Sequence, residues 1–291
     1  MFEGSYVAIV TPFKNGKIDE DAYKKLIQMH LENGTDGIVP CGTTGEASTL
    51  TMEEHIYMIE LTVKLVNKRM KVLAGTGSNC TEDAIDLTKK AEKAGADGAL
   101  VVSPYYNKPT QKGLYLHFKA IAEAVNIPIV VYNIQSRTAV NITTPIMAEL
   151  SKIKNIVGVK EASGDLSQMT DVIRCCRTDF DVLSGDDALT LPLLSVGGKG
   201  VISVVANIVP KDVKELIESF KRGDIKKARE LNLTLFPLIK AMFIETNPIP
   251  VKAALNIMGL IEPEIRLPLT QMEEENKKKL IQAMKNYGIK I

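Results

Sequence analysis

The stretch Ile153–Asp165, with the sequence IKNIVGVKEASGD, decides the fold that we predict for this chain. Its apolar run Ile156–Val159 ends on Lys160 and passes into a loop of small residues. A continuous apolar run that is bounded by turn residues is typical of a strand buried on both faces, as in a parallel sheet. The stretch therefore predicts a strand in the interior of the fold, with a lysine at its C-terminal end.

The position of Lys160 has two interpretations. An ammonium at the end of a buried strand is costly to remove from water unless it is paired or its pKa falls. A lysine with a lowered pKa is a nucleophile that forms a Schiff base with a carbonyl substrate. Alternatively, the side chain extends along the strand end and keeps its charge in solvent. This stretch alone favours the second interpretation, because buried unpaired lysines are rare, and the rest of the chain reverses the preference.

Short apolar runs alternate with amphipathic stretches along most of the sequence. The predicted strands are Tyr6–Val10, Gly37–Val39, Val72–Ala74, Gly98–Val102, Ile129–Tyr132, Ile156–Lys160, Val182–Ser184 and Gly200–Val204. Segments with apolar residues three and four apart, such as Tyr23–Leu31 and Thr81–Ala94, predict helices between them. Eight such units in sequence indicate an α/β parallel sheet, and their number favours a closed (β/α)8 TIM barrel. A doubly wound sheet is the alternative, although no GxGxxG follows the first strand.

Residues at the predicted helix ends support these boundaries. Thr51 and Thr81 are each followed by acidic residues, a pattern that predicts helix N-caps. Gly34 and Gly95 each precede a predicted strand, where a glycine ends the helix before it.

The pattern changes after Val204, and only helices are predicted from residue 210 to the end. They span Lys211–Lys221, Ile225–Phe236, Pro248–Met258 and Met272–Tyr287. The first of them completes the barrel. We therefore expect residues 1–223 to form the barrel that carries the active site and residues 224–291 to form a small C-terminal helical appendage.

Composition excludes several classes of function. The 36 Lys and Arg residues against 35 Asp and Glu give a net charge of +1, so there is no electrostatic case for nucleic acid or an anionic membrane. The apolar runs are too short to cross a bilayer, and the N-terminal stretch lacks the features of a signal peptide. We expect a cytoplasmic protein with reduced and mostly buried thiols at Cys41, Cys80, Cys175 and Cys176.

The few histidines argue against a metal centre. A zinc-dependent aldolase or hydrolase needs several His or carboxylate ligands at the barrel mouth. The three histidines all fall in predicted helices, where we interpret them as surface or interface residues: His30, His55 and His117. We therefore expect covalent catalysis by lysine, with no metal and no cofactor.

Residues after the C-terminal ends of barrel strands carry function in this fold. The turn Cys41–Glu46 follows the second strand, and its residues Thr43 and Thr44 present hydroxyls that bind a carboxylate or relay a proton. Taken alone, the same turn is better interpreted as a βα turn with an N-cap threonine. The other strand ends carry Ser103–Tyr106, Tyr132–Arg137, Ser184–Asp187 and Gly200–Ser203.

Two residue types at this rim add chemistry to the lysine. Tyrosines in such loops are usually packing residues, but here they share a barrel mouth with Lys160, two threonines and an arginine. A tyrosine acts as general acid or base, and the Arg137 guanidinium suits a carboxylate.

The motifs resemble those of the dihydrodipicolinate synthase family of the Schiff-base aldolase superfamily over essentially the whole chain. The matching residues are Gly42–Glu46, Tyr105–Tyr106, Tyr132–Asn133 with Arg137–Thr138, Val159–Glu161, Ser184–Asp186 and Asn247–Lys252. The resemblance implies a lyase that condenses pyruvate with L-aspartate 4-semialdehyde to 4-hydroxy-tetrahydrodipicolinate, in the synthesis of lysine and diaminopimelate.

The resemblance also implies a role for individual residues. Lys160 forms the imine with pyruvate, and a proton relay consists of Tyr132, Thr43 and Tyr106. Pyruvate contacts Thr44 and the backbone at Ile202, Gly185 lines the site, and Arg137 binds the semialdehyde carboxylate. The family's dimer shares the tyrosine at position 106 between subunits, and we expect a homotetramer built from two such dimers.

One residue differs from the usual sequence of the family, and alternative functions stay open. The family usually has proline at the position of Gln135, so the rigidity of the loop that holds Arg137 is in question.

Sialic acid lyase-like and keto-deoxy-sugar aldolases share the lysine, the tyrosine and the threonine turn. Arg137 favours a short carboxylated aldehyde over a sugar. A non-catalytic sensor of pyruvate-like ligands is a further alternative, although it would have lost part of the relay.

Resemblance to lysine-inhibited members implies a regulatory site at a subunit contact. Its residues are Ser48, His55, Asn79, Asp83 and Tyr105. Those members often have glutamate at the position of Asp83, and some have histidine at that of Met52. Whether lysine inhibits this chain is therefore left open.

Overall fold

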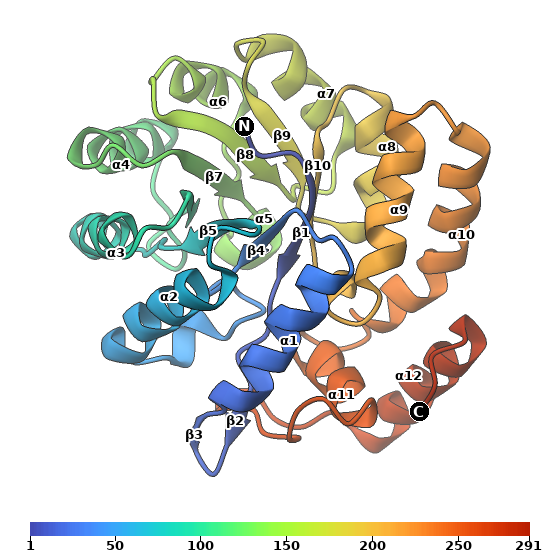
Figure 1. Cartoon of the computed structure of the whole chain (residues 1–291). Coiled ribbons are helices and arrows are strands. Elements are labelled where there is room, and N and C mark those ends of the chain that lie inside the picture. Colours follow the sequence, from blue (N-terminus) through green and yellow to red (C-terminus); the bar gives the residue numbers. More distant parts are fainter.

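The computed structural model describes residues 1–291 and contains the predicted (β/α)8 barrel (Figure 1). All pairs of neighbouring barrel strands are parallel, and their order around the closed sheet is β1-β10-β9-β8-β7-β6-β5-β4. The strands are β1 Gly4–Ala8, β4 Gly37–Val39, β5 Lys71–Gly75, β6 Gly98–Val102, β7 Ile129–Asn133, β8 Ile156–Glu161, β9 Asp181–Ser184 and β10 Gly200–Ser203.

Helices surround the barrel, and further helices follow it at the C-terminus (Figure 1). None of them combines the length and the apolar composition that a membrane span needs. The helices are α1 Glu20–Glu32, α2 Met52–Val66, α3 Thr81–Ala94, α4 Gln111–Ala124, α5 Gln135–Thr138, α6 Thr144–Ser151, α7 Leu166–Cys175, α8 Thr190–Ser195, α9 Pro210–Lys221, α10 Ile225–Ala241, α11 Ile249–Ile257 and α12 Glu274–Tyr287.

The first strand begins and ends two residues earlier than predicted. Its ladder stops at Ala8: Ile9 donates to the Val39 carbonyl of β4 at 3.3 Å, and the next amide, that of Val10, donates to the side-chain Oδ1 of Asn207 at 3.3 Å instead of to a strand. The apolar run alone does not distinguish the residues of the paired strand from the buried residues that come directly after it. A short hairpin after it, β2 Phe13–Lys14 and β3 Lys17–Ile18, was also not predicted.

Two helix boundaries in the structure differ from the predicted ones, and one agrees. Thr51 caps α2 as predicted, in a capping box with Glu54. The prediction that Thr81 is an N-cap is wrong, because Cys80 occupies that position and the Thr81 hydroxyl hydrogen-bonds His117 Nδ1 at 3.0 Å. Helix α10 continues through Pro237 to Ala241 because its buried face extends beyond the proline.

The prediction that the three histidines lie at a surface or interface is also wrong. His30, His55 and His117 are all buried within the chain. His30 bonds the Thr35 hydroxyl and His55 bonds the Gly75 carbonyl, each through one ring nitrogen. Burial lowers the pKa of His30 to about 3 and that of His117 to about 4, so both rings are neutral. Each ring has one hydrogen-bond partner, and the Nε2 atoms of His30 and His117 are buried without one.

The cysteines are free, but only two of the four are buried. Cys41 and Cys176 lie in the interior, whereas Cys80 and Cys175 are exposed near helix ends. The expectation of mostly buried thiols is therefore only half right.

The C-terminal helices share a hydrophobic core with the barrel. One cluster contains Val7 and Ile9 from the first barrel segment together with Leu238 of α10, Leu255 of α11 and Leu280 of α12. The division at residues 223 and 224 stays a prediction, and this cluster joins the two parts that it separates.

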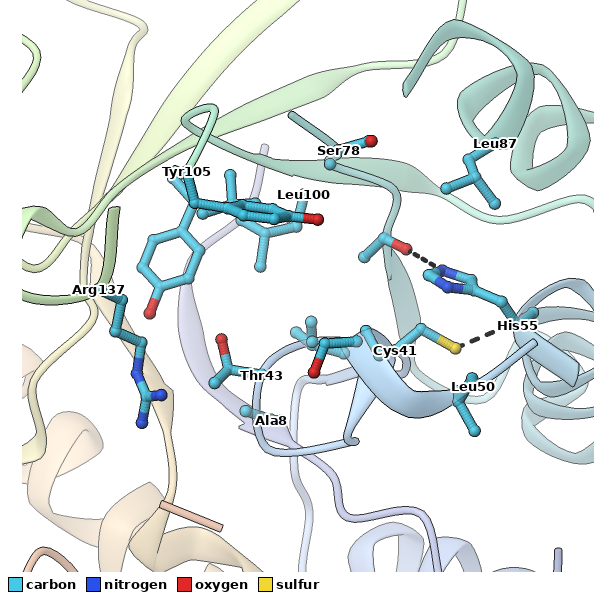
Figure 2. Close-up of a pocket in the computed structure, with 18 of the residues that line it drawn as sticks. Ala8, Cys41, Thr43, Leu50, His55, Ser78, Leu87, Leu100, Tyr105 and Arg137 are labelled. Atoms are coloured by element: carbon cyan, nitrogen blue, oxygen red, sulfur yellow. Dashed lines mark hydrogen bonds between the residues drawn. The ribbon is translucent and has the colours of Figure 1, made fainter. Parts of the chain in front are cut away.

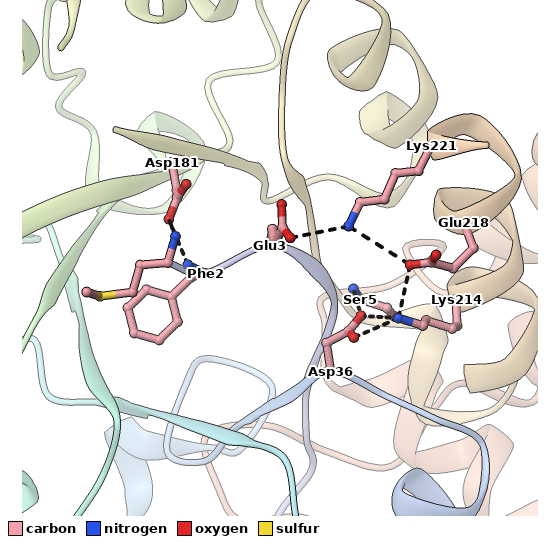
Figure 3. A network of polar contacts seen from close by, with 9 residues as sticks. Phe2, Glu3, Ser5, Asp36, Asp181, Lys214, Glu218 and Lys221 are labelled. Carbon is pink, nitrogen blue, oxygen red and sulfur yellow. Dashed lines mark hydrogen bonds and ion pairs between the residues drawn. The ribbon is translucent and has the colours of Figure 1, made fainter. Parts of the chain in front are cut away.

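A polar network fixes the end of the barrel at which the strands begin (Figure 3). The backbone amide of Phe2 donates to Asp181 Oδ2 at 2.7 Å, which holds the Phe2 ring in the barrel. Lys214 of α9 donates to both oxygens of Asp36 at 2.6 and 2.7 Å, and Asp36 accepts from the Ser5 amide at 2.8 Å. This network ties α9 to β1 and to the chain before β4.

Large and small side chains alternate inside the barrel. Tyr6, Leu73, Val130, Leu183 and Ile202 belong to the interior cluster. A Cβ atom at Gly37 would lie 2.0 Å from Cε1 of Tyr6, so the glycine leaves the space that the ring fills. Protein interiors are close-packed, and such space is not available for a second group.

We expect Gly37→Ala to lower the free energy of unfolding by about 1–3 kcal/mol, the usual cost of overpacking a core. Chemical denaturation measures the change. In a Tyr6→Leu background the same substitution should cost markedly less, because the clashing ring is gone. An equal cost in both backgrounds would refute the proposed conflict between Gly37 and Tyr6.

Candidate active site

A cavity of about 420 Å³ opens where the barrel strands end (Figure 2). Lys160, Tyr132, Thr43 and Arg137 all line it, so the fold brings four of the sequence-predicted residues to one space. In Figure 2, Arg137 lies toward one side of the cavity, whereas Leu50, His55 and Leu87 gather at the other. The cavity therefore has a polar region around the lysine and a more apolar extension beside α2 and α3.

Lys160 lies on β8 between Tyr132 of β7 and Leu183 of β9. The residue is only 6% exposed, and its Nζ lies 4.3 Å from the centroid of the Tyr132 ring. The pKa of Lys160 is lowered to about 7, mainly by burial; the Asp187 charge opposes this shift and the Arg137 charge contributes to it. The ammonium gives up its proton far more readily than an exposed lysine, as a nucleophilic amine requires.

Asp187 is the carboxylate that acts on Lys160 through its charge, and the sequence did not single it out. It is 4% exposed and accepts hydrogen bonds from the backbone amides of Val204 and Val205 at 2.9 and 3.1 Å. Burial raises its pKa. Its place in the Ser184–Asp187 turn was the only signal in the sequence.

Gly185 lies beside the lysine side chain. A Cβ atom there would lie 3.1 Å from both Cγ and Cε of Lys160 and 2.7 Å from Cβ of Ala162. The absence of a side chain at Gly185 therefore leaves the path of Lys160 open. Ile202, the other predicted lining residue, lies on β10 opposite Tyr6 and is buried in the barrel interior.

Tyr132 and Thr43 form the polar wall next to the lysine. Burial raises the pKa of Tyr132 to about 12, while the Arg137 charge and the Thr43 hydroxyl act in the opposite direction. The phenol is therefore protonated near neutral pH and is able to donate a proton. Thr43 lies in the turn after β4, across the cavity from strand β8.

Thr44 is not among the residues that line this cavity. It is buried, and its Oγ1 accepts a hydrogen bond from Asn247 Nδ2 at 3.0 Å. The carbonyl of the same Asn247 accepts from the Arg137 guanidinium at 3.0 Å. Asn247 thus links two predicted substrate-binding residues, and only its place in the Asn247–Lys252 motif marked it in the sequence.

The loop that carries Arg137 is held by hydrogen bonds where the family usually has proline. Asn133 Oδ1 accepts from the Ile142 amide at 3.0 Å, and Asn133 Nδ2 donates to both oxygens of the buried Glu161 at 3.1 and 3.2 Å. The start of the loop is therefore bonded to Glu161 of β8, and its end is bonded to Asn133 of β7, although residue 135 is glutamine.

The adjacent tyrosines point in different directions. Tyr105 lines the cavity, whereas Tyr106 is 89% exposed with a φ of 73°. A positive φ is uncommon for a bulky residue and marks a backbone held by its surroundings. Here Asn107 Nδ2 donates to the Asn79 carbonyl at 2.8 Å and fixes the loop. The structure does not bring Tyr106 to Lys160 within one chain.

Most residues of the predicted regulatory site line the same cavity. Ser48, His55, Asp83 and Tyr105 all line it, and Asn79 does not. His55 bonds the Gly75 carbonyl at 2.7 Å, and burial lowers its pKa. The site's assignment stays a prediction.

Known proteins of one kind resemble this chain along its whole length. The model of the dihydrodipicolinate synthetase family matches residues 1–287. The 4-hydroxy-tetrahydrodipicolinate synthase of Syntrophus aciditrophicus is 61% identical over 289 residues, which cover 99% of each chain.

Solved structures agree with this finding. The dihydrodipicolinate synthase of Aquifex aeolicus is 52% identical, covers 99% of each chain and superimposes with a TM-score of 0.98. The chloride-inhibited enzyme of Acinetobacter baumannii, complexed with pyruvate, is 48% identical with a TM-score of 0.97, and the match covers 99% of this chain and 100% of that one. The resemblance that the motifs predicted is confirmed, and the chain belongs to the dihydrodipicolinate synthetase family.

Proposed function

We propose that this protein is a lyase that condenses pyruvate with L-aspartate 4-semialdehyde to form 4-hydroxy-tetrahydrodipicolinate. Family membership and the name of the 61% identical relative support the reaction. The observation that carries the proposal is the buried Lys160, whose pKa falls to about 7 beside a cavity of substrate size. The pyruvate complex of the Acinetobacter baumannii enzyme supports the first substrate.

The chemistry begins with the neutral amine of Lys160. It attacks the keto carbon of pyruvate, and loss of water from the adduct gives an imine. Removal of a methyl proton turns the imine into an enamine, whose carbon attacks the aldehyde of the second substrate. The amine of the semialdehyde then displaces Lys160 from the imine carbon, closes the ring and returns the free lysine.

Tyr132 handles the protons of these steps. Its phenol is protonated at neutral pH and adjoins both Lys160 and Thr43, which suits a donor to the oxygen that leaves as water. Thr43 passes protons between Tyr132 and a second tyrosine. We propose that this is Tyr106 of a partner subunit, because Tyr106 of the same chain faces outward.

The carboxylates of the two substrates need separate donors. The Gly42–Glu46 turn, in which Thr43 lines the cavity and Thr44 is held by Asn247, serves pyruvate, with Gly185 and Ile202 nearby. The Arg137 guanidinium is exposed at the cavity mouth and keeps donors free beyond its bond to Asn247, so it serves the semialdehyde carboxylate.

We also propose how the subunits assemble, where the protein is located and how it is regulated. A shared Tyr106 requires at least a dimer, and a homotetramer of two dimers fits the family resemblance. The location that we propose is the cytoplasm. Lysine binding near Ser48, His55, Asn79, Asp83 and Tyr105 is supported by the four of them that line the cavity.

Borohydride should trap pyruvate on Lys160, and peptide mapping should find the adduct on that residue alone. Because only the neutral amine attacks, the initial trapping rate at low pyruvate should rise with pH up to about 7 and then level off. Lys160→Arg should give no adduct at any pH. An adduct on another lysine, or none in the unmodified protein, contradicts the mechanism; consumption of aspartate semialdehyde by the unmodified protein then tests the second step.

Arg137→Ala should impair the semialdehyde step and leave imine formation with pyruvate nearly intact. Loss of a charge-assisted contact should reduce kcat/KM for the semialdehyde by about 10–100-fold, which corresponds to about 1.5–3 kcal/mol. Steady-state kinetics and borohydride trapping separate the two effects. If N-acetylmannosamine or another sugar aldehyde is the better acceptor for the unmodified protein, the chain is a sugar aldolase instead.

Co-expression of Tyr106→Phe and Lys160→Ala tests whether sites are shared. Each variant alone should lose activity, by about 10²–10⁴-fold for the tyrosine. In mixed dimers one site combines an intact Lys160 with an intact Tyr106 from the other chain, so random pairing restores about a quarter of all sites. Activity that stays at the mean of the two variants would show that Tyr106 serves its own chain.

A further inference from the structure

A buried ion pair lies directly behind the turn that carries Thr43 and Thr44. Glu46 ends this turn and is 1% exposed, and Lys252 of α11 places its Nζ 2.5 Å from Glu46 Oε1. The two residues are 206 positions apart in the sequence. Neither contacts the cavity, so the catalytic scheme above leaves both without a role.

Every polar group of this pair has a partner. Lys252 Nζ also donates to the Thr11 carbonyl at 3.1 Å and lies 4.4 Å from the centroid of the Phe13 ring. The second oxygen of Glu46 accepts from the Arg266 amide at 3.1 Å. Full satisfaction gives the pair one geometry, since any displacement exposes a buried charge to an apolar surrounding.

The positions of the two threonines in the turn depend on the position of Glu46. The Glu46 amide donates to the Thr43 carbonyl at 3.1 Å, and the Gly45 carbonyl accepts from the Thr11 hydroxyl at 2.7 Å. Glu46 has a φ of 55°, a left-handed conformation that its partners must hold in place. A shift of the carboxylate therefore moves Thr43 and Thr44.

The same C-terminal segment makes two further bonds to the neighbourhood of this turn. Arg266 binds both oxygens of Glu54 at 2.6 Å, and Glu54 belongs to the capping box of α2. Asn247 donates to Thr44 Oγ1, as described above. The barrel supplies the turn, and residues of the segment Asn247–Arg266 fix it from outside.

We propose that Lys252 is a positioning residue: through its buried pair with Glu46 it fixes the Gly42–Glu46 turn, and so sets the affinity of the site for pyruvate. This inference rests on the proposed function, because the turn matters only if it binds the pyruvate carboxylate. A buried ion pair is weak evidence for a stabilising role, since neutral pairs of similar volume are often as stable.

The test separates positioning from stability. Lys252→Met leaves a buried carboxylate alone, so it should lower Tm and reduce kcat/KM for pyruvate by about 10–100-fold, the usual effect of a misplaced binding group. The double variant Glu46→Gln with Lys252→Met removes both charges. Its Tm should return most of the way to that of the unmodified protein, while its KM for pyruvate should stay raised, as in Lys252→Met. Saturating pyruvate should still give the borohydride adduct on Lys160.

A matched control removes another lysine from its ion pair far from the site. Lys214→Met breaks the contact with Asp36 at the opposite end of the barrel and should lower Tm without a change in KM for pyruvate. Recovery of KM together with Tm in the double variant, or an unchanged KM in Lys252→Met, overturns the positioning role. Failure of the unmodified protein to trap pyruvate overturns the proposed function itself, and the inference with it.

Discussion

Removal of the Lys160 ammonium from water is the constraint on which this site depends. The closed barrel encloses the strand end, and burial lowers the pKa of the amine to about 7. Gly185 leaves a path for the side chain, Asp187 limits the shift, and the Tyr132 ring covers Nζ. The lowered pKa of Lys160 is thus a consequence of where the fold places it, because an amine of the same type in solvent stays charged.

Around this lysine the protein holds its other polar groups from several directions. The turn with Thr43 is fixed from behind by residues of the C-terminal helices, and the Arg137 loop is fixed to β8 by Asn133 and Glu161. These supports are buried and fully hydrogen-bonded, so each resists small displacements. Because the barrel and the C-terminal helices share one hydrophobic cluster, the supports are part of the same packed body as the strands.

Much of the site could be predicted because its residues follow strand ends. In a parallel barrel all strands end on one rim, so Thr43, Tyr132, Arg137 and Lys160 had to meet once eight strands were recognised. Residues that support them indirectly could not be found in this way. Asp187 and Asn247 act across hydrogen bonds between segments far apart in the chain, and no local pattern encodes such pairs.

The sequence by itself determined the barrel, the family and the place of Lys160 at the end of a buried strand, because apolar periodicity and strand-end motifs are local properties of the chain. Tertiary structure decided what depends on contacts between distant segments. It decided the burial of His30, His55 and His117, each of which finds one hydrogen-bond partner outside its own helix. It decided that Tyr106 faces outward while Tyr105 faces the cavity, because successive residues of one loop diverge at a positive φ. It also joined Glu46 to Lys252, since only the packed fold brings residues 206 positions apart within the reach of an ion pair.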